Sequence, residues 1–342
     1  MKSGSIALAF AAFVAAFVAA APLAAQEQKP LPAPTAPSAA PAAVDTAQHE
    51  SALARHEEQV EKADIITPHI TDGKHIEVPS LNASHGFARE IELPSGWPVF
   101  HIGSFVIDTS PTKLMVMLWV VATLLTVLLI GAARAHKRRA AEGLPPKGLA
   151  GGVEAIVLYM RNEVILPNVG PHGDAFVPYL LTIFFFILTA NLLGLVPYMA
   201  TATGNIAVTA TLAIMTFVVI EVAGMRALGK GYINTIIFWP HDIPLMMRIP
   251  MSIILSPVEL ISKFTKPFAL AIRLFANMTA GHIVVLAMLG LVFTFRSYIA
   301  SPAPVAMAVA IMLLELLVAF VQAFIFTLLS SVFIGLVRES HH

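Results

Sequence analysis

Long uncharged apolar runs constrain this chain more than any other feature. Residues 114–133 contain no charged side chain. About twenty helical residues cover about 30 Å, the thickness of the hydrocarbon core of a bilayer. Hydrophobic residues make up 57% of the chain and charged residues only 12%, whereas roughly 25% is usual for soluble domains. The sequence therefore predicts a polytopic membrane protein rather than a soluble enzyme.

Charge balance and motif content exclude several classes of function. The 21 basic and 21 acidic residues cancel, so no net basic field attracts nucleic acid. The absence of cysteine excludes disulfides, thiolate metal sites and thiol nucleophiles. Because the chain also lacks a glycine-rich phosphate loop, we expect ATP chemistry to occur on another chain. We expect no cofactor, no metal and no enzyme active site here.

The N-terminal part is predicted to lie outside the cytoplasm. Residues 1–25 have the basic, apolar and small-residue order of a secretory signal peptide, with an ordinary first membrane helix as the alternative. Residues 26–105 form a polar, Pro/Ala-rich extension, expected to be a small and partly ordered extracytoplasmic domain. Six of the twelve histidines lie there, but their irregular spacing favours solvated surface histidines over a metal site.

Residues 106–342 are predicted to form an all-α membrane domain of five membrane helices and one interfacial helix. Basic residues directly after the first helix mark its cytoplasmic end, which places the N-terminus outside and the C-terminus in the cytoplasm. The last two helices exceed the bilayer thickness and should be tilted. The expected helices are at about 112–133, 149–168 (interfacial), 176–198, 205–226, 256–296 and 303–338. Residues 231–256 are expected to be a broken connector, and a turn is expected at 301–304.

Polar side chains interrupt the last two apolar segments. Arg273 is flanked by apolar residues on both sides, where an arginine costs roughly 2.5–3.5 kcal/mol and cannot escape by deprotonation. No acidic residue lies one helical turn away, so a structural ion pair would need a partner from another segment. A functional charge is therefore the favoured interpretation, with a structural arginine as the alternative.

The spacing of the other polar groups suggests how the two helices pair. His282 lies nine residues after Arg273, while Glu315 and Gln322 are seven residues apart on one stripe of the final helix. Antiparallel packing can set His282 beside Glu315 and Gln322 near Arg273. A buried His/Glu pair is suited to relaying protons, and a hydrogen-bonded core pair is the alternative.

These residues closely resemble subunit a of the F-type ATP synthase, in its bacterial form. Residues 266–282 (KPFALAIRLFANMTAGH) resemble the arginine-centred signature of that family, and residues 321–334 (VQAFIFTLLSSVFI) resemble its final helix. Residues 189–198 and 154–168 resemble its first hairpin helix and its interfacial segment. The resemblance covers about residues 95–338.

The resemblance implies a proton-translocating stator subunit of the cell inner membrane, with the c-subunit ring, b-type stator subunits and the rest of the complex as partners. Two half-channels would then meet the ring at Arg273, which favours ionisation of a passing c-subunit carboxylate. The resemblance also places His282 and Glu315 in the outer half-channel, and it gives Gln322 the role of supporting the arginine. Further channel-lining residues would be Asn191, Asn277, Glu259 and Ser262. At Gly194 this sequence departs from some bacterial relatives, which have an acid.

Other classes of function fit the sequence less well. A secondary transporter that binds an anionic substrate at Arg273 should show an internal repeat, and we find none. An intramembrane hydrolase should carry a His-Glu-x-x-His motif, a Gly-x-Ser-x-Gly motif or paired aspartates, which are lacking. A purely structural anchor would not need four polar groups in two adjacent apolar helices.

Overall fold

The computed structural model describes residues 72–79, 88–94, 99–102, 105–108, 110–196, 199–229, 231–232, 245–295 and 301–339. The predicted signal peptide at 1–25, the linker after it and the middle of the predicted connector lie outside these residues. Five described helices are long and apolar enough to cross a membrane, which confirms the predicted fold class. They are α4 (Lys113–Ala141), α7 (Val177–Gly194), α8 (Ile206–Leu228), α9 (Leu245–Phe295) and α10 (Pro302–Glu339).

The described strands all precede α4. Strand β1 (His75–Pro79) pairs antiparallel with β2 (Ala88–Glu92), and β3 (Val99–Ile102) pairs with β4 (Phe105–Asp108). Asp72, just before β1, joins the first hairpin to the start of α4, because its Oδ1 accepts a hydrogen bond from the backbone N–H of Leu114 at 3.2 Å. The extension is thus tied to the first membrane helix.

The first helix is longer than predicted. It was predicted to end at Ala133, just before the charges begin at Arg134, but α4 continues to Ala141. Charge ends a membrane span without ending a helix, and alanine, lysine and arginine are good helix formers. The chain turns at Gly143, whose φ of 67° favours glycine. The basic segment after residue 133 is therefore a helical extension of α4 beyond the apolar span.

The predicted interfacial segment is helical, in three pieces. It comprises α5 (Leu149–Tyr159), the π-helical turn η1 (Met160–Ile165) and α6 (Leu166–Val169), and it is followed by the 3₁₀ turn η2 (Gly173–Ala175). The end of α10 docks on it: Arg338 donates hydrogen bonds to the carbonyls of Val169 and Pro171. Gly335 permits this approach, because a Cβ there would overlap the carbonyl oxygen of Asn168.

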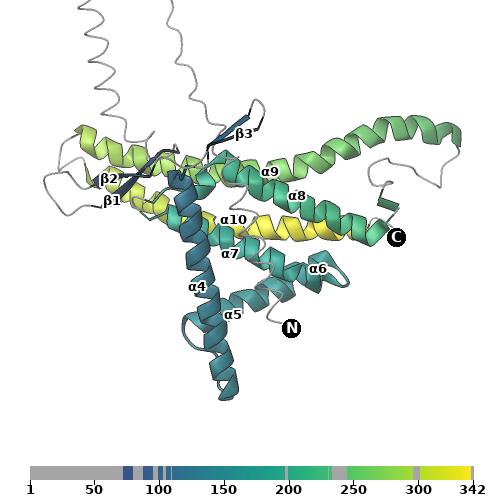
Figure 1. The fold of residues 1–342 in the computed structure, drawn as a ribbon, viewed down its shortest axis with the longest axis horizontal. Helices are drawn as coiled ribbons and strands as arrows, with labels where there is room; N and C mark the ends of the chain where they lie inside the picture. Colours follow the sequence, from purple (N-terminus) through teal and green to yellow (C-terminus); the bar gives the residue numbers. More distant parts are fainter. Residues whose placement is uncertain are drawn as a thin grey trace, which may run out of the picture.

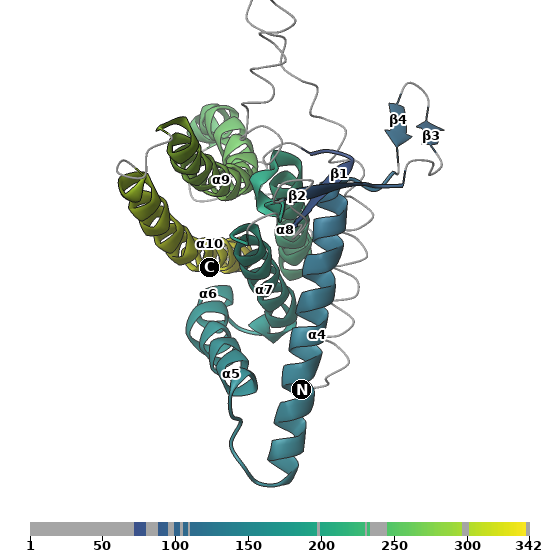
Figure 2. The ribbon, with the colours of Figure 1, turned by 90° about the vertical axis from the view of Figure 1, so that its left-hand side faces the viewer.

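Helix α7 forms the centre of the bundle. Most of its side chains are buried, including Phe186 and Ile187, and it contacts both α4 and α10. It ends at Gly194, four residues earlier than predicted, because Pro197 disfavours helix at the residue before it. The chain returns through the 3₁₀ turn η3 (Ala202–Gly204) into α8. Figure 2 shows α9 and α10 on one side of α7 and α4 on the other.

The largest correction concerns the segment before α9. Residues 245–256 were predicted to belong to a broken connector, yet they form the first turns of α9, with Pro250 and Pro257 inside the helix. Each proline removes one backbone hydrogen bond. The exposed side chains here include Ile253 and Ile254, and in an apolar medium every further unpaired backbone group is costly, so the helix continues. Similarly, Pro302 and Pro304 lie in the first turn of α10 rather than in a separate turn.

The last two helices are far longer than one perpendicular span. The apolar part of α9, Ile249–Val292, has 44 residues and is about 66 Å long, more than twice the hydrocarbon thickness. Figure 1 shows α9 and α10 side by side along the long axis of the molecule, with α4 running across that axis. In a membrane spanned by α4, this arrangement inclines both helices strongly, as their length predicts.

Candidate proton-path site

Arg273 lies near the middle of the apolar part of α9, 24 residues after Ile249 and 19 before Val292. Its side chain is exposed, and no acidic group lies within ion-pair distance of it among the described residues. The exposed residues one turn to either side include Ala269 and Ala276, which are small. The charge is therefore presented on an outer face of the bundle that an apolar helix of another chain can approach closely.

Asn277, one helical turn after Arg273, connects this face to α10. Its Nδ2 donates a hydrogen bond of 3.0 Å to Oε1 of Gln322, whose side chain is buried. The Nε2 atom of Gln322 has no hydrogen-bond partner among the described residues. Gln322 is thus linked to the residue one helical turn after Arg273, and it keeps one unpaired donor group.

Glu315 lies deeper between the same two helices. Its side chain is 5% exposed, and its Oε1 has no hydrogen-bond partner among the described residues. The carboxylate packs against Gly281 of α9, where an added Cβ would lie 2.8 Å from Cδ of Glu315. His282 follows Gly281 directly and is half-buried. The structure therefore places Glu315 at the level of His282, as the antiparallel register predicts.

Asn191 ties α7 to the same region. It is fully buried, its Oδ1 accepts a 2.7 Å hydrogen bond from the Thr203 hydroxyl, and its Nδ2 donates to the carbonyl of Ala319 at 3.4 Å. Ala319 lies one turn after Glu315 on α10. Thr203 was not predicted, because a threonine in a short loop carries no periodic signal. Side chains from α7, η3, α9 and α10 thus meet in one polar region between these helices. We call it the polar seam; its residues are Asn191, Thr203, Asn277, His282, Glu315 and Gln322.

The loop that follows α7 packs closely against Gly194. A Cβ at Gly194 would lie 2.9 Å from both Cγ2 and Oγ1 of Thr201, so the loop after α7 closes directly over the glycine. An acidic side chain at this position would require the Thr201 side chain to shift. The structure thus accounts for the departure noted in the sequence.

Glu259 and Ser262 are not brought into this seam. Both are exposed on α9, 14 and 11 residues before Arg273, which corresponds to about 16–21 Å along the helix. The same part of α9 also carries, on its side toward α8, a polar cluster that was not predicted. Lys263 is 8% exposed, donates to the hydroxyl of Tyr232 at 3.1 Å, and lies 3.5 Å from the Glu221 carboxylate of α8.

Sequence comparison identifies the family. Residues 115–335, more than half of the chain, match the family described as ATP synthase A chain. The chain is 46% identical to ATP synthase subunit a of Chloroherpeton thalassium over 284 residues, which cover 82% of this chain and 79% of that relative. It is 40% identical to ATP synthase subunit a of an Anaeromyxobacter species over 319 residues, covering 87% of this chain and 76% of the relative.

A third relative, ATP synthase subunit a 2 of Chlorobium luteolum, is 44% identical over 323 residues and aligns with 92% of this chain and 85% of its own length. The family match spans α7, α8, α9 and most of α10, and so includes the whole polar seam between Asn191 and Gln322. On this evidence, the chain is a multi-pass membrane protein that belongs to the ATP synthase subunit a family.

Proposed function

We propose that this chain is the proton-translocating stator subunit of an F-type ATP synthase and has no catalytic site of its own. The observation that carries the proposal is Arg273, a permanent cation exposed in the middle of an apolar helix with no acidic partner among the described residues. An exposed cation at that depth has a high free-energy cost unless a partner provides an opposite charge beside it. A carboxylate on a neighbouring rotor helix supplies that partner.

The partner surface is the ring of c subunits. Arg273 favours the ionised form of a c-subunit carboxylate that comes opposite it, and so promotes release of its proton. The same positive charge repels protons and blocks direct leakage past the ring contact. Small exposed residues such as Ala269 and Ala276 leave room for the approaching ring helix. The b-type stator subunits and the rest of the complex hold this chain against rotation.

Protons reach and leave the ring through two half-channels. The outer one runs along the seam of Asn191, His282 and Glu315, whose groups can accept and donate protons. Gln322 and Asn277 form its inner boundary beside Arg273, since the hydrogen bond between them spans the gap from α10 to the face of the arginine. Glu259 and Ser262 line the inner exit on the exposed side of α9.

This role sets the orientation in the cell inner membrane. Basic residues occupy the last turns of α4, α8 and α10, which are Arg138 and Arg139, Arg226 and Arg338 respectively. Positive charge gathers at cytoplasmic ends of membrane helices. The C-terminus is therefore cytoplasmic, and the extension before α4 lies outside the cytoplasm.

The test is Arg273→Ala in the complete ATP synthase, with Arg226→Ala, another exposed arginine, as the matched control. ATP-driven acidification of inverted membrane vesicles and ATP synthesis should both be lost in Arg273→Ala and retained in the control, at equal amounts of subunit in the membrane. Normal acidification by Arg273→Ala refutes the proposal.

A further inference from the structure

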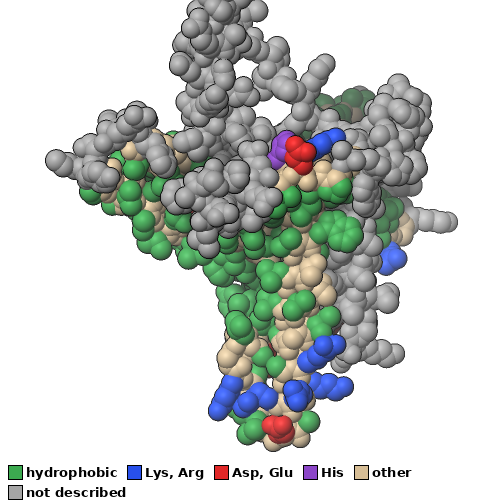
Figure 3. Space-filling model, turned by 60° about the vertical axis from the view of Figure 1, so that its left-hand side comes forward, with side chains coloured by type: hydrophobic (Ala, Val, Ile, Leu, Met, Phe, Trp, Pro, Cys, Tyr) green, Lys and Arg blue, Asp and Glu red, His purple; other side chains and the backbone are tan. Residues whose placement is uncertain are grey.

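The outward face of α4 changes from apolar to basic along a single stripe. The exposed residues on this face lie within about 140° of the helix circumference at 100° per residue. They are, in order, Trp119, Thr123, Leu124, Val127, Ile130, Gly131, Arg134, Lys137 and Arg138. No ion pair of the three cations is found among the described residues. Figure 3 shows basic side chains gathered around the lower end of α4, below a mostly hydrophobic surface.

The length of α4 as a whole matches the layers of a bilayer. From Lys113 to Arg134 the helix rises about 31 Å, close to the thickness of the hydrocarbon core. From Arg134 to Arg138 it rises about 6 Å, which is comparable to one headgroup layer of about 5–8 Å. When the apolar part of α4 spans the membrane, the three cations therefore lie at the level of the phosphate groups.

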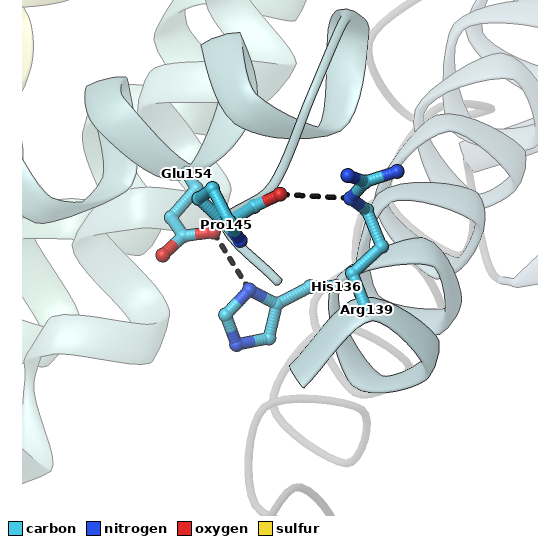
Figure 4. Close-up of polar contacts among 4 residues, drawn as sticks. All are labelled: His136, Arg139, Pro145 and Glu154. Carbon is cyan, nitrogen blue, oxygen red and sulfur yellow. Dashed lines mark hydrogen bonds and ion pairs between the residues drawn. The ribbon is translucent and has the colours of Figure 1, made fainter. Parts of the chain in front are cut away.

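The turn between α4 and α5 is held by two polar contacts next to these cations. His136, on the opposite side of α4, lies 2.7 Å from the Glu154 carboxylate of α5, and the Nε of Arg139 donates to the carbonyl of Pro145 at 2.7 Å (Figure 4). Glycines with positive φ open and close the turn, Gly143 at 67° and Gly148 at 64°. Two basic side chains are thus used inside the turn, which fixes α5 against α4.

The turn presents an apolar side chain next to a further cation. Leu149, the first residue of α5, is 80% exposed, and Lys147 two residues earlier is also exposed. Leu144, on the same turn, is 47% exposed. Exposed leucines beside exposed cations are typical of surfaces that lie in the membrane interface, with the apolar groups in the acyl boundary and the cations at the headgroups.

We propose that the end of α4 and the following turn form a binding site for anionic phospholipid headgroups. Arg134, Lys137, Arg138 and Lys147 contact the phosphates, while Leu149 enters the acyl boundary. The continuity of the basic stripe with the apolar stripe above it argues for a lipid rather than an acidic protein, because the membrane has this same order of layers. The site is independent of the proton path, which lies on α9 and α10.

The test uses the purified complete ATP synthase carrying the triple change Arg134→Gln, Lys137→Gln and Arg138→Gln. The probe is phosphatidylglycerol in mixed detergent micelles, with phosphatidylcholine as the neutral lipid, and retained lipid is counted by native mass spectrometry. The unmodified complex should retain phosphatidylglycerol in preference to phosphatidylcholine. The triple variant should lose most of that preference, and the control Arg226→Gln should keep it.

Two further variants keep the test decisive. If the triple variant fails to assemble, Lys137→Gln and Leu149→Ser are measured singly, and each should reduce phosphatidylglycerol retention several-fold. Unchanged retention in these variants overturns the proposal. Loss of another subunit from the complex with unchanged lipid retention also overturns it, because that result assigns the basic surface to a protein partner.

Discussion

Glu315 of α10 lies directly against Gly281 of α9, with no space for a side chain between them. A methyl group at Gly281 would overlap the Glu315 carboxylate. We predict that Gly281→Ala displaces this carboxylate and lowers ATP-driven proton pumping, because a group that moves away from its productive position transfers protons poorly. Pumping by inverted vesicles measures the effect.

Gly290 provides the matched control on the same helix, since a Cβ there meets nothing within 4 Å. Gly290→Ala should pump normally, and it should stabilise α9 by up to about 1 kcal/mol through helix propensity. Equal pumping by the two alanine variants would show that the Gly281 contact does not position Glu315.

The proximity of His282 to Glu315 makes a second prediction. Exchanging them, His282→Glu with Glu315→His, keeps one imidazole and one carboxylate at the same level of the seam. The exchange should therefore retain more ATP synthesis than either His282→Ala or Glu315→Ala, each of which removes one proton-transfer group. Equal loss in all three variants argues against a direct pair.

The Glu221–Lys263 pair predicts a coupled effect on stability. Glu221→Gln leaves the buried Lys263 ammonium beside Tyr232 without its carboxylate partner, and breaking a buried ion pair costs about 3–5 kcal/mol. We expect the lower end of that range, because Tyr232 still accepts a hydrogen bond. The readout is the thermal inactivation temperature of the complex.

The double change Glu221→Gln with Lys263→Met should recover most of this loss, because it removes both charges together. The exposed pair of Arg161 and Asp174, 2.8 Å apart, is the control, and Asp174→Asn should cost less than about 1 kcal/mol. If the Glu221 and Lys263 losses simply add, the two residues are not energetically coupled.

Asp72 predicts a pH effect outside the membrane. Burial raises the pKa of Asp72 above its ordinary value, and hydrogen bonds from Leu114, Thr112 and Gly73 only partly oppose this. The docked form then binds a proton more tightly than the undocked form. The stability that this group contributes to docking therefore falls as the pH rises from about 4 through the raised pKa.

Hydrogen exchange at the Leu114 amide, corrected for the intrinsic pH dependence, measures this docking. Asp72→Asn keeps an acceptor oxygen without the buried charge, so it should retain protection at neutral pH. Asp72→Ala removes the acceptor and should cost about 0.5–2 kcal/mol, as for other helix caps. Protection that increases with pH in the unmodified chain would contradict the assignment.

Much of the fold is predictable from local sequence. Apolar run length identified the five spanning helices, since the bilayer sets a physical length that each run must meet. Their ends were less predictable, because the charge at Arg134 ended the apolar run without ending α4, and Pro250 did not stop α9. Helix ends depend on capping and on backbone hydrogen bonds, which hydropathy does not report.

The sequence by itself determined which polar groups lie in the apolar helices, because an arginine at that depth carries a cost that no surface residue has. It also predicted that Glu315 would lie level with His282. Only the tertiary structure decided three contacts. Glu315 packs against Gly281, the Thr203 hydroxyl donates a hydrogen bond to Asn191, and Lys263 forms an ion pair with Glu221. These contacts join segments far apart in the chain, and they depend on how the helices are rotated and how closely their backbones approach, which the helical period alone does not specify.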